Sequence, residues 1–132
     1  MEDVRSYNVG ASDYSEYLVQ VWDLWIDYKL MSFDGDLLKR TLRHKATDSR
    51  ALDKRKIIHV AKERIRQIDE GDWWVYPKIN PKYSVEYIAK EYKLNYDDTM
   101  IVKFILNVSD NRKSDYENII KYASKELEEK ND

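Results

Sequence analysis

Apolar residues recur at helical spacing in the first half of the chain and predict three helices. These helices cover about residues 14–30, 35–46 and 50–70. The side chains expected to point inward are Leu18, Val21, Trp22, Trp25 and Ile26 in the first, Leu37, Leu38 and Leu42 in the second, and Leu52, Ile58, Ala61, Ile65 and Ile68 in the third. Asp34 is in position to cap the second helix, and Gly71 is in position to end the third.

The second half carries a similar pattern after a connector, WWVYPKINPKY, which contains both prolines of the chain. Ser84 caps a fourth predicted helix, a fifth begins at about Asp98, and a sixth covers about residues 113–129. Their inward positions are Val85, Ile88, Ala89 and Tyr92, then Met100, Ile101, Phe104 and Ile105, then Tyr116, Ile119, Ile120, Ala123 and Leu127. The whole pattern predicts an all-α fold.

Short phrases in the two halves match each other in order. YKL occurs at 28–30 and again at 92–94, and IIHVA at 57–61 matches IIKYA at 119–123. Between them, Phe33-Asp34 aligns with Tyr96-Asp97, so that the offset falls from 64 to 62 through a single-residue gap in each of two predicted loops. Helical periodicity alone would not reproduce these phrases, and we expect a tandem duplication of a three-helix unit. The predicted repeats are residues 1–72 and 83–132, joined by residues 73–82 into one compact domain.

The composition supports a helical protein without covalent cross-links. The chain of 132 residues contains only three Gly and two Pro, and it has no Cys, which excludes disulfides and thiolate metal sites. No apolar run approaches the roughly 20 residues that a membrane helix needs, and the acidic N-terminal segment does not resemble a signal peptide. A cytoplasmic protein is therefore expected.

Charge is distributed unevenly along the chain, although the formal net charge is only −2. Residues 39–66 contain 11 Lys and Arg against three Asp and Glu, whereas both flanking regions are acidic. The candidate phosphate- or partner-binding residues on the second and third predicted helices are Lys39, Arg40, Arg43, Arg55, His59, Lys62 and Arg66. The alternative is a solvated face that acidic residues of the first helix balance.

Two further groups of residues have both a functional and a structural interpretation. Asp23 and Asp27 share one face of the first helix and could bind Mg²⁺, or they could pair with the basic helices. Trp73, Trp74 and Tyr76 could stack on a base or contact a partner protein, or they could fill the seam between the repeats. The structural interpretation is favoured for both groups, and no metal or other cofactor is expected.

The basic segment also carries a family resemblance. Its motif residues are Gly35, Asp36, Lys39, Arg40 and Arg43, followed by LDKRK at 52–56, and a fainter copy begins with NPKY at 80–83. This arrangement resembles the SaV-like family of short bacteriophage proteins, which includes a region of a coliphage nucleotide kinase that lacks a P-loop. The second copy departs from the motif at four positions, which hold Asp98, Thr99, Val102 and Leu106. The resemblance implies a phage protein with phosphate-related chemistry in its first repeat.

These observations lead to two hypotheses about function. The first is a phage accessory protein that binds a nucleotide or another phosphorylated small molecule through the basic face of the first repeat. The second is a phage inhibitor of a host enzyme or defence system that acts by protein–protein interaction, as a monomer or a homodimer. Nucleic-acid binding is less favoured because the second half is acidic. No catalytic motif indicates an enzyme.

Overall fold

The computed structural model describes residues 18–43, 47–71, 76–107 and 111–130. These residues form six helices: α1 (Val21–Asp27), α2 (Ser32–Leu42), α3 (Thr47–Asp69), α4 (Val85–Glu91), α5 (Tyr96–Ile105) and α6 (Arg112–Lys130). Within the described ranges there is no β-strand, and the predicted all-α fold is confirmed. No helix in these ranges is both long enough and apolar enough to cross a membrane.

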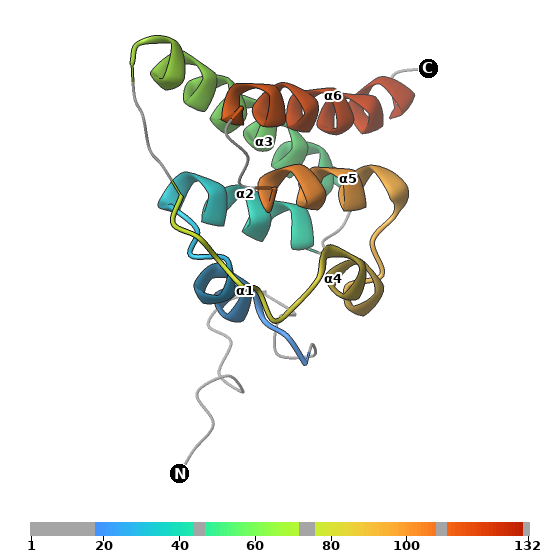
Figure 1. Ribbon diagram of the computed structural model, residues 1–132. Helices are drawn as coiled ribbons and strands as arrows, with labels where there is room; N and C mark the ends of the chain where they lie inside the picture. The colour runs from blue at the N-terminus through green and yellow to red at the C-terminus, as the bar shows by residue number, and fades with distance from the viewer. Residues whose placement is uncertain (1–17, 44–46, 72–75, 108–110, 131–132) are drawn as a thin grey trace.

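The helices are arranged as three pairs, one above another (Figure 1). The long helices α3 and α6 lie side by side and make the most extensive contact between any two helices. Helices α2 and α5 contact each other, and they also pack on α3 and α6 respectively. The short helices α1 and α4 lie at the far end, against α2 and α5. Each half of the chain therefore contributes one helix to every pair.

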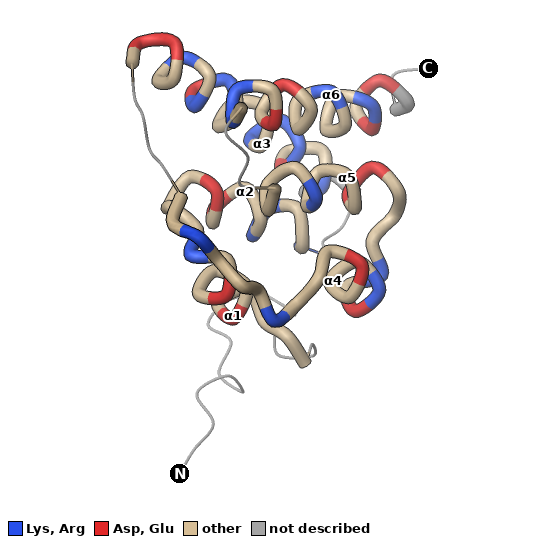
Figure 2. Tube along the Cα trace, in the orientation of Figure 1, with Lys and Arg blue, Asp and Glu red and all other residues tan. Residues whose placement is uncertain are grey.

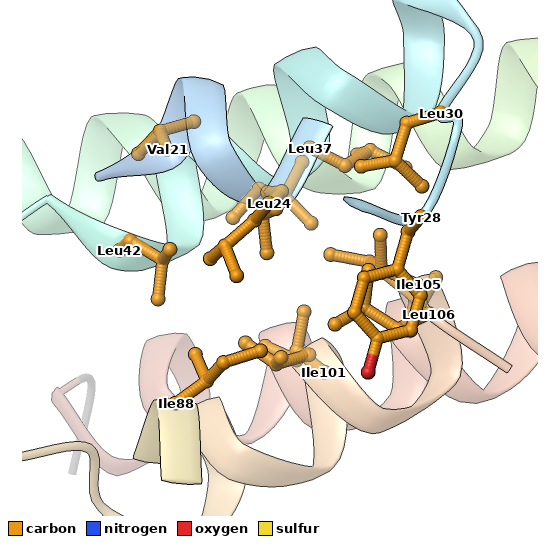
Figure 3. Close-up of a cluster of buried hydrophobic side chains, with 14 of the residues drawn as sticks. Val21, Leu24, Tyr28, Leu30, Leu37, Leu42, Ile88, Ile101, Ile105 and Leu106 are labelled. Atoms are coloured by element: carbon orange, nitrogen blue, oxygen red, sulfur yellow. The ribbon is translucent and has the colours of Figure 1, made fainter. Parts of the chain in front are cut away.

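The two halves share one hydrophobic core. Leu24 and Leu37 from the first half face Ile88 and Ile101 from the second half (Figure 3), and all four side chains are completely buried. Burying one such aliphatic side chain stabilises the folded state by about 1.5–3 kcal/mol. Much of the apolar surface of each half is thus removed from water by the other half.

The face that α1 presents to the core agrees only in part with the predicted one: Val21 is buried and Trp25 packs against the core as predicted, but the other three predicted side chains do not point inward. Val21 and Leu24 are buried, with exposed fractions of 4% and 0%. The three side chains that are instead exposed to solvent, by 80%, 70% and 77%, are Leu18, Trp22 and Ile26. Because α1 is apolar on both sides, helical spacing fits either choice, and packing on α2 decides which side is buried. Residues 14–17 of the predicted helix lie outside the described residues.

Asp34 does not cap α2, contrary to the expectation from sequence. Met31 is the N-cap residue, and Asp34 lies in the first turn of the helix. There the carboxylate is completely buried and is bonded to groups from α6. An acidic residue in the first turn is also favoured by the helix dipole. Local sequence cannot reveal that a cation distant in the chain will meet it inside the protein.

Other helix ends follow from local chemistry. The Ser84 hydroxyl accepts a hydrogen bond of 3.1 Å from the Tyr87 amide, which confirms the predicted cap of α4. Gly71, two residues after the end of α3, adopts a φ of 101°, as expected for a glycine that ends a helix. Helix α5 begins earlier than predicted because Asn95 caps it.

Leu52, predicted to point inward from α3, is 46% exposed.

Several backbone features recur 64 residues apart. Helices α1 and α4 have seven residues each, and each is followed by a lysine with left-handed backbone, Lys29 at φ 50° and Lys93 at φ 54°. The next amide, of Leu30 or Leu94, donates to a carbonyl five residues earlier, at 3.0 and 2.9 Å. The two short helices therefore end in the same way.

The two halves also exchange equivalent hydrogen bonds. The Tyr28 hydroxyl donates to the Tyr83 carbonyl at 2.5 Å, and the Tyr92 hydroxyl donates to the Val19 carbonyl at 2.7 Å. Tyr92 lies 64 residues after Tyr28, and Tyr83 lies 64 residues after Val19. One bond is therefore the counterpart of the other with the two halves exchanged.

The burial pattern of the two middle helices agrees better at an offset of 64 than at the predicted offset of 63. At an offset of 64, Asp34 corresponds to Asp98 and Leu37 to Ile101, and all four are at most 2% exposed. The predicted offset of 63 would instead match the buried Leu37 with the half-buried Met100.

The contact between α1 and α2 requires Gly35. A Cβ atom at this position would lie 2.5–2.6 Å from three ring atoms of Trp25, well inside van der Waals contact. The indole ring covers the backbone of α2 at this point. Gly35 therefore has a packing role, apart from any part in a phosphate-binding motif.

Replacement Gly35→Ala should lower the free energy of unfolding by about 1–3 kcal/mol because the added methyl group displaces the Trp25 ring. Urea unfolding followed by circular dichroism measures the loss. In a Trp25→Leu background the same replacement should cost much less, since alanine favours a helix over glycine by about 1 kcal/mol. Equal losses in the two backgrounds would contradict the packing role.

Candidate functional site

Two of the predicted phosphate-binding side chains join α2 to α3. Arg40 and Arg43 both donate to Oδ1 of Asp53, at 3.4 and 3.3 Å, and Arg40 also donates to Asp36 at 2.9 Å. The Asp53 side chain is buried on α3 between them. Lys39 is exposed on α2. The cluster of basic residues in α2 is therefore partly neutralised within the protein.

Helix α3 carries a run of exposed basic residues. It consists of Arg55, Lys56, His59 and Lys62, which we call the α3 basic face. Figure 2 shows the Lys and Arg positions of the chain in blue along its Cα trace. Steps of three and four residues keep Arg55, His59 and Lys62 on one side of the helix. In the part of the chain that the structure describes, Arg55, Lys56 and Lys62 form no ion pair. Lys56 was missed by sequence reasoning, although it directly follows Arg55.

Arg66 continues this side of α3, but it is paired with acidic neighbours. Its guanidinium donates to Glu63 at 2.6 and 3.0 Å and to Glu70 at 2.6 Å. The hydrogen bonds from Arg66 lower the pKa of Glu63 to about 2. The two carboxylates leave a net negative charge at this point. Of the predicted basic residues, Arg66 is therefore poorly placed to bind an anion.

Asp34 lies at the centre of a buried polar cluster that sequence reasoning did not find. The carboxylate accepts hydrogen bonds from the hydroxyl groups of Tyr76 and Tyr116, the latter at 2.7 Å. It also forms an ion pair with Arg112 at 3.0 Å, and Arg112 in turn pairs with Asp115 at 3.0 Å. Burial and the nearby Asp34 charge raise the pKa of Tyr116 to about 12. Burial followed by the Asp34 charge also raises the pKa of Tyr76.

Asp98 lies at the centre of a second buried cluster. Its carboxylate pairs with Arg50 at 2.8 Å and with Lys54, and both Lys54 and Asp98 are at most 3% exposed. Glu126 completes the cluster, because Arg50 and Lys54 approach it at 3.3 and 3.4 Å. Two carboxylates thus meet two cations inside the protein.

The two clusters occupy corresponding places in the two halves. The matching residues are Asp34 with Asp98, Arg50 with Arg112, Lys54 with Tyr116, and Arg64 with Glu126. In both clusters the aspartate of a middle helix is bonded by the long helix of the other half. Sequence reasoning assigned charged helical positions to the surface, where most of them lie. An alignment at an offset of 64 would have matched the two aspartates.

The acidic candidates on α1 have structural roles. Asp27 accepts hydrogen bonds from the backbone amides of Lys82 and Tyr83 at 2.8–3.0 Å. Asp23 accepts one from the Gln20 amide at 2.9 Å. Among the described residues, no group of three or more His, Cys, Asp or Glu is placed to hold a metal ion. These backbone hydrogen bonds satisfy the Asp27 carboxylate without a bound cation.

Of the predicted interface aromatics, Trp73 and Trp74 lie outside the described residues. Tyr76 is half-buried, and its hydroxyl accepts a hydrogen bond of 3.1 Å from the Met31 amide while it donates to Asp34. Its ring also lies 5.5 Å from the guanidinium of Arg112. Tyr76 therefore packs between the two halves, and the structural interpretation describes its position.

Comparison of the chain with protein-family models, with curated proteins and with solved structures found no match. Arguments about function consequently rest on the chain's own residues.

The Asp34 cluster should contribute more to the free energy of unfolding than the surface ion pairs of α2 do. Replacement Asp34→Asn leaves the buried Arg112 without one of its carboxylate partners and should lower the free energy of unfolding by about 3 kcal/mol or more. The matched replacement Asp36→Asn breaks only the partly exposed pair with Arg40 and should cost about 1 kcal/mol or less. Urea unfolding of both variants measures the difference, and similar losses would contradict a structural role for the cluster.

Proposed function

We propose that this chain is a small phage-type accessory protein that binds a nucleotide or another phosphorylated small molecule on the α3 basic face. The observation that carries the proposal is the group of exposed cations formed by Arg55, Lys56 and Lys62. These three form no ion pair in the described part of the chain. Guanidinium and ammonium groups at helical spacing present several donors to phosphate oxygens at once.

A duplicated architecture supports this choice of surface. We infer that α1–α3 and α4–α6 are the two predicted repeats, because contacts and helix ends recur at offsets of 64 and 62. On α6 the positions that correspond to the α3 basic face hold Glu117, Asn118, Lys121 and Ser124. The fold is therefore compatible with a nearly neutral surface at this place. The excess of cations on α3 needs a reason other than folding, and a bound anion provides one.

Three of the basic residues that the sequence suggested for phosphate binding are engaged in ion pairs within the protein. Arg40 and Arg43 are engaged by Asp53, and Arg66 is engaged by Glu63 and Glu70. An anion on the α3 basic face would contact Arg55, His59 and Lys62 without breaking any of these ion pairs. The three cations of this face, Arg55, Lys56 and Lys62, match a di- or triphosphate better than a single carboxylate.

Calorimetric titration of the full chain with nucleoside mono-, di- and triphosphates and with inorganic pyrophosphate tests the proposal. The double replacement Arg55→Ala and Lys62→Ala should weaken binding at least about tenfold, because each charge-assisted hydrogen bond contributes about 1.5–3 kcal/mol. The control, Lys103→Ala with Lys121→Ala, removes two exposed cations from the second half and should leave affinity unchanged. Absence of binding at millimolar ligand, or equal effects of both variants, would refute the proposal.

A second candidate function is protein–protein interaction through the exposed apolar residues of the first half, Leu18, Trp22 and Ile26, which we call the α1 apolar face. Their counterparts at an offset of 64 are Lys82, Glu86 and Lys90, all exposed. The same fold therefore accepts charged side chains at these positions. A large apolar side chain that is 70% exposed, such as Trp22, is typical of binding surfaces. This observation favours the inhibitor hypothesis.

Replacing Trp22→Glu and Ile26→Lys introduces the residues that the chain itself carries at the corresponding positions. Stability should change by less than about 0.5 kcal/mol per site because both side chains are exposed. A partner recovered from a host lysate, identified and then purified, should bind the wild type and lose most of its affinity for the double variant. Unchanged affinity for that purified partner would exclude the α1 apolar face as its binding surface.

A further inference from the structure

The buried clusters lie on the contact between the two halves, and each contains groups from both. Asp34 of α2 is held by Arg112 and Tyr116 of α6, at 3.0 and 2.7 Å. Asp98 of α5 is held by Arg50 of α3 at 2.8 Å and by Lys54. Both aspartates are buried, so that each half depends on the other to neutralise its central carboxylate.

We propose that these clusters make the two halves specific, charge-complementary partners, so that the segment α1–α3 binds the segment α4–α6 and neither segment binds a copy of itself. The interaction surface is the α2–α3 side of the first segment, and the partner that fits it is the α5–α6 side of the second. This inference rests on the contacts between the halves and is independent of any ligand on the α3 basic face.

Charge balance distinguishes the native pairing from the alternatives. In the Asp98 cluster, Asp98 and Glu126 face Arg50 and Lys54, which gives two negative and two positive groups. In the Asp34 cluster, Arg112 lies between Asp34 and Asp115, and Arg64 donates to Tyr116 at 3.3 Å. That cluster therefore contains two carboxylates, those of Asp34 and Asp115, and two guanidinium groups, those of Arg112 and of Arg64, which is 2% exposed.

A pair of identical segments would lose this balance. Since Arg64 and Glu126 occupy corresponding positions, two copies of the first segment would surround each Asp34 with Arg50, Lys54 and Arg64. Asp53, which corresponds to Asp115, is already paired with Arg40 and Arg43 of its own segment, so that each Asp34 would face three cations. Two copies of the second segment would place three carboxylates, those of Asp98, Asp115 and Glu126, beside a single cation, Arg112. Uncompensated charges away from water are costly, so that both identical pairings are disfavoured.

A cleavable version of the full chain tests the proposal. A protease recognition sequence inserted after the exposed Lys78 allows the folded protein to be cut between the halves. Native mass spectrometry should then show a complex of one first segment with one second segment and no pair of identical segments. Separation of the two fragments into monomers, or formation of identical pairs, would overturn the proposal.

Charge reversal at one position separates electrostatic matching from packing. Glu126→Lys in the cleaved protein places a third cation beside Arg50 and Lys54 and should weaken the complex at least about tenfold. The control Glu128→Lys makes the same charge change at an exposed position of α6 and should alter affinity by less than about threefold. Equal effects of the two variants would overturn the assignment to charge matching. Urea unfolding of both variants in the uncut chain should give the same order of stability.

Discussion

Each half of this protein buries an aspartate that is neutralised by the other half. An ionised carboxylate inside a protein is stable only with hydrogen bonds and an opposite charge. The groups that satisfy Asp34 come mainly from α6, and those that satisfy Asp98 come from α3. This requirement is met because α3 reaches Asp98 of α5 and α6 reaches Asp34 of α2. The paired arrangement of helices (Figure 1) and the shared core (Figure 3) are consistent with it.

The interior of the two halves is similar, whereas their surfaces differ. Positions with equivalent burial or backbone conformation recur through most of the described residues, as in Lys29 and Lys93. The α3 basic face and the α1 apolar face have no such counterparts, because charged or neutral residues replace them in the second half. Under the proposed duplication, the first half carries both proposed binding surfaces and the second half completes the fold. The second half then needs no phosphate-binding residues of its own.

The sequence also predicted part of the candidate site. The basic residues of α3 that were predicted to bind phosphate, Arg55, His59, Lys62 and Arg66, are exposed, and the first three share one side of the helix. The sequence did not indicate that Arg43 would bond to Asp53, since a long side chain on a helix can reach several neighbours. Nor did the sequence indicate that Arg66 would pair with Glu63 and Glu70, three and four positions away.

Local chemistry in the sequence determined the existence of the six helices, the cap at Ser84 and the end of α3 at Gly71. These features depend on residues within a few positions of one another, so that periodicity and capping rules suffice. Only the tertiary structure decided which side of α1 is buried and that Asp34 lies inside the protein. Trp22 and Leu24 suit an apolar environment equally well, and Asp34 suits a helix start in water or a buried ion pair. Contacts between residues distant in the chain select one of these outcomes, and such contacts leave no local pattern.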